Sequence, residues 1–181
     1  YKDILKNEAI RENKHNLAAN WALFLQNKKP KTQEQKDKGV IACSAGNHAQ
    51  GVALSCKLLG IKSKIVMPII APQAKVDATR GYGSEVILAG ETFDDAKSAC
   101  EEIYKETGET FLHPYDDDFV IAGQGTIGIE ILQEHWDVDT VIVPIGGGGI
   151  ISGVALALKS FNPNITFFGS KITELILLIS L

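Results

Sequence analysis

The sequence predicts an α/β fold built on parallel sheets, and three observations support this prediction. Short apolar segments alternate with longer segments of helical periodicity through residues 39–168. Glycine or proline closes several of these segments, as Gly60 and Pro68 do. Residues 141–143 form a continuous apolar run, which is typical of a strand in a sheet covered on both faces. Strands that alternate with helices imply parallel pairing through right-handed crossovers.

The first two predicted helices have clear signals at their ends. Residues 47–59 carry apolar side chains and are followed by Gly60, the residue type that most often ends a helix. Residues 71–82 have Pro72 in the first turn and Gly83 after the last one. Both segments therefore read as complete helices between strands.

The third helix, residues 92–106, repeats apolar residues at helical spacing. Thr92, followed three residues later by Asp95, resembles a capping box with Asp in place of Glu. The acidic run at residues 116–118 is interpreted as a solvated turn. The remaining expected elements are helices at 125–134 and 150–161 and strands at 39–43, 64–67, 84–88, 110–112, 140–144 and 165–168.

Composition excludes several classes of protein. The chain has 181 residues, of which 45% are hydrophobic and 22% charged, so global disorder is disfavoured. A net charge of −4 without a basic stripe argues against nucleic acid as a partner. No apolar run reaches the roughly 18 residues that span a membrane. Three cysteines without a CxxC pair, and no signal peptide, favour a reducing cytoplasmic location, and no cluster of Cys and His has metal-site spacing.

Four consecutive glycines, Gly146, Gly147, Gly148 and Gly149, follow an apolar strand and precede a helix. Glycines at such a junction let backbone N–H groups approach a ligand, and the helix N-terminus favours an anion, most simply a phosphate. The lysine of a Walker A loop is missing, which disfavours nucleoside-triphosphate hydrolysis. The alternative is a flexible tight turn, at a cost in backbone entropy.

A second candidate anion site lies at residues 44–48, Ser-Ala-Gly-Asn-His, also between a strand and a helix. Backbone N–H groups and the Asn47 amide could bind a small anion there. The structural alternative is that Ser44 or Asn47 caps the helix. His48, taken alone, is more typical of a surface residue at a helix start than of a catalyst.

Residues 123–128 (Gly-Gln-Gly-Thr-Ile-Gly) match the GxGxxG pattern of dinucleotide-binding folds. The context is poor because no clear strand precedes the pattern and no acidic residue follows at the expected distance. The simpler interpretation is a helix start packed closely against a neighbour. A nucleotide-binding α/β module remains an alternative on this motif.

Together these motifs resemble one enzyme family. The chain is similar to the pyridoxal-phosphate enzymes of the tryptophan-synthase-β type (fold type II), and specifically to the serine/threonine ammonia-lyases, biodegradative threonine dehydratase and serine racemase. Within residues 32–169 the resemblance is carried by segments 39–51, 67–75, 114–117 and 120–126. It implies a two-lobed α/β fold, here incomplete at both ends, and conversion of L-threonine or L-serine to a 2-oxo acid and ammonia.

The resemblance also implies roles for the two glycine-containing loops. The four glycines 146–149 would hold the phosphate of pyridoxal 5′-phosphate, and Asn47 would bond the phenolic oxygen of its ring. The carboxylate of a small amino-acid substrate would be bound, largely through backbone N–H groups, by Ser44, Ala45, Asn47 and His48. Ala45 stands where racemases of the family have a second serine, which favours an ammonia-lyase over a racemase.

The chain departs from the family in its first residues. The family's catalytic lysine lies in a Ser-Phe-Lys-x-Arg-Gly-Ala segment, which is absent here, and an ungapped register places Asn20 at the lysine position. The catalytic residue is therefore unknown from the sequence. A truncated, inactive homologue that binds phosphate ligands or pairs with an intact subunit is an alternative to a working enzyme.

The expected organisation follows from where the resemblance holds. Residues 1–31 form an N-terminal helical segment that does not match the family, and 32–115 form a small α/β lobe. Residues 116–169 form part of a large lobe, and 170–181 are an unmatched apolar tail. A folded chain of this type is expected to form a homo-oligomer.

Overall fold

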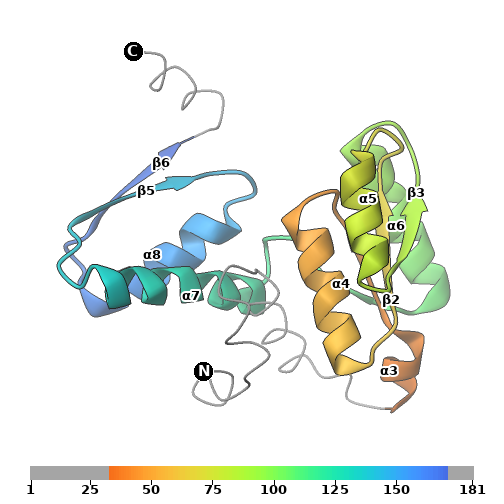
Figure 1. The fold of residues 1–181 in the computed structure, drawn as a ribbon, viewed down its shortest axis with the longest axis horizontal. Helices are drawn as coiled ribbons and strands as arrows, with labels where there is room; N and C mark the ends of the chain where they lie inside the picture. The colour runs from red at the N-terminus through yellow and green to blue at the C-terminus, as the bar shows by residue number, and fades with distance from the viewer. Residues whose placement is uncertain (1–32, 171–181) are drawn as a thin grey trace. The chain divides into compact units, whose positions relative to one another are not determined.

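A computed structural model describes residues 33–170 of the chain (Figure 1). The chain divides into two compact units, Tyr1–Pro114 and Tyr115–Leu181. Every strand pairing in the described residues is parallel, with one sheet in each unit. The predicted α/β class with parallel sheets is therefore confirmed.

The amino-terminal unit is a four-stranded sheet with the strand order β3-β2-β1-β4. Its elements are α3 (Gln33–Lys38), β1 (Val40–Cys43), α4 (Asn47–Leu59), β2 (Ser63–Met67), α5 (Gln73–Gly81), β3 (Glu85–Leu88), α6 (Phe93–Thr107) and β4 (Thr110–Phe111). The chain moves outward from β1 through β2 to β3, and β4 then returns to the other side of β1. The direction of winding therefore reverses between β1 and β4.

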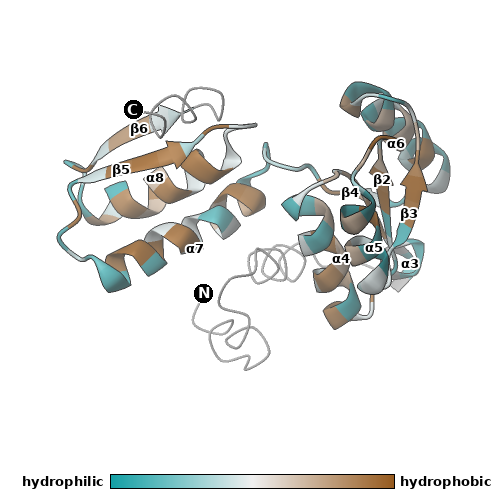
Figure 2. Ribbon diagram, turned by 45° about the horizontal axis from the view of Figure 1, so that its top comes forward, coloured by the Kyte–Doolittle hydropathy of each residue, from teal (hydrophilic) through white to brown (hydrophobic). Residues whose placement is uncertain are grey.

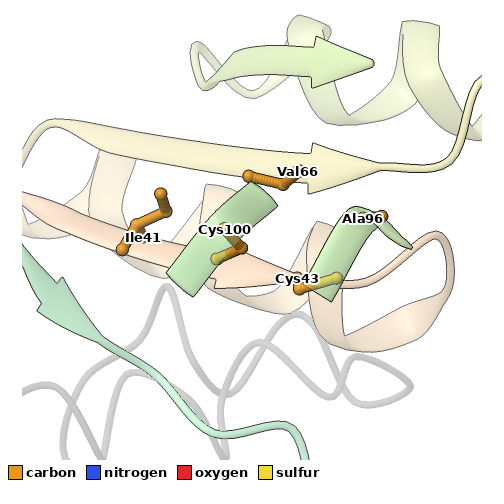
Figure 3. Packing of buried hydrophobic residues seen from close by; sticks show 5 residues of the cluster. All are labelled: Ile41, Cys43, Val66, Ala96 and Cys100. Carbon is orange, nitrogen blue, oxygen red and sulfur yellow. The ribbon is translucent and has the colours of Figure 1, made fainter. Parts of the chain in front are cut away.

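The core of this unit lies on both faces of β1 and β2. Helix α6 covers one face, where buried residues form a cluster (Figure 3). Its members are Ile41, Cys43, Val66, Ala96 and Cys100. Strand alternation turns Ala42, Ile65 and Met67 to the opposite face, where they are fully buried and where α4 and α5 pack. Burying a large apolar side chain completely stabilises a fold by about 1.5–3 kcal/mol.

The helix ends in this unit have the chemistry that the sequence predicts. Gly60 ends α4 with a left-handed φ of 64°. At the start of α6, the Asp95 N–H donates to Thr92 Oγ1 (3.2 Å), and the Thr92 N–H donates to the Asp95 carboxylate (2.9 Å). This reciprocal pair is a complete capping box.

The carboxyl-terminal unit contains α7 (Asp118–Glu134), β5 (Thr140–Pro144), α8 (Gly149–Phe161) and β6 (Thr166–Ser170). The expected start of its first helix, at residue 125, is wrong, because α7 begins at Asp118. The Asp117 carboxylate caps the helix by accepting from the N–H groups of Phe119 (2.9 Å) and Val120 (3.4 Å). An acidic run that reads as a solvated turn is thus in part a helix start.

One face of the β5-β6 sheet packs on α7 and α8. The buried side chains there are Val143, Val154, Leu158 and Ile165. On the other face Ile142 and Phe168, which are register partners, are 65% and 57% exposed. Figure 2 shows that the greater part of β5 is hydrophobic. The expectation that both faces are covered is therefore wrong for the described part of the chain, in which both helices pack on the same side.

Candidate functional site

The amino-terminal unit has a reversal point at the carboxyl ends of β1 and β4. The connection after β1 leads away to β2, whereas β4 pairs with β1 from the other side. In open α/β sheets, loops diverge at such a point and leave a crevice that binds ligands. Residues 44–48 follow β1 directly, so the structure places this loop at the reversal point.

The backbone of this loop ends in a helix start that no side chain caps. Gly46 is the N-cap residue of α4, and it forms no side-chain cap hydrogen bond with the first turn. The Ser44 hydroxyl instead accepts from the Gly46 N–H at 3.2 Å. The expected alternative, capping by Ser44 or Asn47, is therefore wrong. The N-terminus of a 13-residue helix retains backbone donors for an anion, and Asn47 beside them is exposed.

His48 lies inside the unit, with 9% of its surface exposed. Burial lowers the pKa of His48 to about 4, although its hydrogen bond to the Leu112 carbonyl acts in the opposite direction. The ring is therefore neutral at pH 7, and its Nε2–H donates to Leu112 O at 3.3 Å. A surface position for His48 is wrong. Its observed contact joins the start of α4 to the residue after β4, across the reversal point.

The tetraglycine loop lies between β5 and α8 in the carboxyl-terminal unit. Gly148 is the N-cap residue of α8 and adopts φ +90°, a conformation that glycine accepts without strain. No side chain caps this helix either. Alanine Cβ atoms at Gly146 and Gly148 would meet no atom within 4 Å, whereas Gly147 and Gly149 pack against Tyr115. The loop thus has one open side, next to an uncapped 13-residue helix.

The GxGxxG pattern lies within α7 and serves helix packing. Cβ atoms built at Gly125 and Gly128 would lie 3.2 Å from Gly153 O and 3.0 Å from Val154 O, both on α8. The pattern is neither a loop nor preceded by a strand, as a dinucleotide site requires. The structure therefore favours the packing interpretation and removes the basis for a nucleotide-binding module.

Within the described part of the chain, neither the cysteines nor a metal-binding cluster adds a reactive group to the two loops. The three cysteines are buried, and burial raises the pKa of Cys43 to about 11 and those of Cys56 and Cys100 to about 12. They are therefore protonated thiols at neutral pH. Among residues 33–170, no group of three His, Cys, Asp or Glu side chains could hold a metal ion. Asn20, at the expected lysine position, lies outside the described residues.

Sequence reasoning missed Tyr115 and the burial of His48. Tyr115 was visible only as part of a turn-rich segment, and its contact with Gly147 bridges residues far apart in the sequence. A weak signal for His48 exists, because Gly51 and Val52, which follow it by one helical turn, are small or apolar.

Comparison with known proteins assigns a family to these loops. The family model described as "Pyridoxal-phosphate dependent enzyme" matches residues 10–175, which extends beyond the 32–169 stretch of the resemblance at both ends. The L-threonine dehydratase catabolic TdcB of Staphylococcus aureus (strain USA300) is 64% identical over 138 residues. These residues are 76% of this chain and 40% of that protein, so the chain spans well under half of this curated relative.

Solved structures agree with this assignment. The processed form of threonine deaminase isoform 2 from Solanum lycopersicum superposes with a TM-score of 0.77 at 44% identity, over 84% of this chain and 41% of that chain. Maize serine racemase gives a TM-score of 0.75 at 40% identity, over 85% of this chain and 45% of that chain. Both the sequence motifs and the fold therefore place this chain in the pyridoxal-phosphate dependent enzyme family.

Proposed function

We propose that this chain provides the cofactor-phosphate site and the substrate-carboxylate site of an ammonia-lyase that converts L-threonine or L-serine to a 2-oxo acid and ammonia. The observation that carries the proposal is the open tetraglycine loop at the N-terminus of α8. The relatives that support the substrate are named as threonine dehydratase and threonine deaminase. The names of these relatives indicate threonine as the substrate, and the two loops offer the groups that would bind it.

The tetraglycine loop fits the phosphate of pyridoxal phosphate. Side chains at Gly146 and Gly148 would project into the open side, so their absence leaves a cradle of backbone. The uncapped N–H groups of α8 add donors and a favourable field for a dianion. When bound, the cofactor supplies an electron sink for the bond changes at the substrate's α- and β-carbons.

The loop at residues 44–48 suits the substrate carboxylate. The N-terminus of α4 offers backbone N–H donors and a favourable field for an anion. His48 fixes the loop through Leu112, so we assign it a positioning role. The exposed Asn47 amide can donate to the cofactor's phenolic oxygen, as the family resemblance implies. Ala45 favours β-elimination of the substrate hydroxyl over racemisation, because a second serine is missing from this loop.

A second candidate is a cofactor-binding homologue without catalysis. It is favoured by the absence of the lysine segment and by Asn20 at its ungapped position. Such a protein would bind the cofactor phosphate but could not hold it covalently through a lysine or use that amine as a base.

Borohydride trapping separates the two candidates. The purified chain is incubated with pyridoxal phosphate, reduced with borohydride, and mapped by mass spectrometry, and 2-oxo acid formation from L-threonine is measured. Stoichiometric labelling of one lysine with turnover supports the ammonia-lyase. Saturable binding without a specific label supports the inactive homologue. Absence of any saturable binding contradicts both candidates.

We also propose a cytoplasmic location and self-association. The three free, buried thiols support a reducing compartment. The described residues contain no helix long and apolar enough to cross a membrane. The exposed Ile142–Phe168 face of the β5-β6 sheet supports association with a second copy, because exposed apolar patches of this kind tend to be covered.

A further inference from the structure

Tyr115 covers one side of the tetraglycine loop. A Cβ atom built at Gly147 would overlap with Cγ and Cδ1 of the Tyr115 ring and lie 2.6 Å from its Cε1. A Cβ atom at Gly149 would lie 3.0 Å from the Cβ of the same tyrosine and 3.1 Å from its Cα and carbonyl oxygen. Carbon atoms in ordinary contact are about 3.5–4.0 Å apart. A side chain at Gly147 would therefore displace the Tyr115 ring, and one at Gly149 would need Tyr115 to shift by a few tenths of an ångström.

The other two glycines of the loop are explained differently. Gly148 has open space but adopts φ +90°, so a larger residue there is strained. Gly146 has open space and no positive φ, so the fold alone gives no reason for glycine at this position. Cβ atoms at Gly147 and Gly149 would meet Tyr115, whereas Cβ atoms at Gly146 and Gly148 would enter open space.

We propose that Tyr115 is a positioning residue for the phosphate loop, and that phosphate binds on the opposite, open side, marked by Gly146. A run of four glycines has great backbone freedom, and each loses it on ordering. Packing against a rigid aromatic ring holds the backbone in one conformation before the ligand arrives, which lowers the cost of binding. This inference rests on the proposed cofactor site.

A double-mutant cycle tests the packing without any ligand. Gly147→Ala, Tyr115→Ala and the double variant of the 181-residue chain are compared by denaturant unfolding. If the ring causes the glycine requirement, Gly147→Ala destabilises the original chain but not the Tyr115→Ala background. We expect a coupling of about tenfold in the unfolding equilibrium constant. Additive effects would overturn the packing role of Tyr115.

Binding of pyridoxal phosphate, measured by equilibrium dialysis, tests the orientation of the site. Gly146→Ala leaves the unfolding midpoint unchanged but weakens binding by at least about tenfold, because its methyl group enters the ligand's space and displaces N–H donors. Tyr115→Phe, which keeps the ring, binds like the original chain, whereas Tyr115→Ala binds more weakly. Unchanged affinity in Gly146→Ala would overturn the assignment of the open side.

These experiments distinguish a failure of the Tyr115 inference from a failure of the proposed function. If the unaltered chain does not bind pyridoxal phosphate, the cofactor site and this role for the loop both fail. The unfolding cycle then still decides whether Tyr115 imposes glycine at position 147. Coupling in the cycle together with equal phosphate affinity in Tyr115→Ala would restrict the tyrosine to a structural role and contradict its positioning role.

Discussion

Replacing Gly153 by alanine should separate α7 from α8 and displace the helix that follows the tetraglycine loop. A Cβ atom at this position would overlap with the carbonyl oxygen of Ile121 and lie 2.7 Å from Gln124 Cβ and from Gly125 N. Two of the three obstacles are backbone atoms, which no rotamer change can move. The helices must therefore shift apart along a contact that contains much of this unit's packing.

The magnitude follows from two opposing effects. Overpacking a tightly packed site costs about 1–3 kcal/mol. Alanine is favoured over glycine within a helix by up to about 1 kcal/mol. The first effect wins here because the overlap is with main chain, and a net loss of about 1–2 kcal/mol is expected. This loss corresponds to a roughly 5- to 30-fold increase in the population of the opened helix pair.

Hydrogen exchange followed by mass spectrometry measures this loss separately for each unit. Peptides from α7 and α8 should exchange faster in Gly153→Ala by that factor. Gly81→Ala is the matched control, because Gly81 also lies in a helix but a Cβ atom there meets nothing within 4 Å. Exchange in α5 should be unchanged or slower in that variant. If Gly153→Ala protects α7 and α8 as well as the original chain does, the steric argument is refuted.

Three further predictions follow from the described contacts. Because burial lowers the pKa of His48 to about 4, protonation of this histidine should destabilise the fold. The free energy of unfolding should fall by up to about 3 kcal/mol as the pH drops from 6.5 toward 4. His48→Gln should remove most of this pH dependence from the unfolding profile. Glu109→Gln should destabilise the amino-terminal unit by about 1–3 kcal/mol in denaturant, because the buried carboxylate accepts from Lys64 Nζ at 3.2–3.3 Å; equal stability would contradict this. Replacing Ile142 and Phe168 together by threonine should shift the chain toward monomer in analytical ultracentrifugation, and an unchanged distribution would exclude this face from association.

The sequence predicted best where the relevant interaction is local. Gly60 and the Thr92–Asp95 pair act within one helical turn, so their chemistry can be read from spacing alone. The early start of α7 was missed for a related reason. Asp117 occurs in an acidic run whose composition resembles a turn, and only the observed hydrogen bonds distinguish a cap from a solvated side chain.

The two loops of the candidate site were predictable from the sequence, but the residues that pack against them were not. Strand-to-helix junctions with glycine identify backbone donors directly from sequence, and both loops lie where they were expected. His48 and Tyr115 depend on contacts with Leu112 and Gly147, which the order of strands and the return of the chain create. No local pattern encodes such contacts, so residues that hold a loop in place are harder to predict than the loop.

Glycine illustrates why a motif alone cannot assign a function. Gly125 and Gly128 belong to a pattern associated with phosphate binding, yet both lie within a helix against α8. Gly148 is required by its backbone angle and Gly147 by a tyrosine ring. Of these five glycines, Gly146 alone is not explained by packing or by its backbone angle. A requirement for glycine that comes from ligand binding should therefore be tested at Gly146. A methyl group at Gly146 therefore probes binding with the least disturbance of folding, whereas the same change at the other four perturbs the structure first.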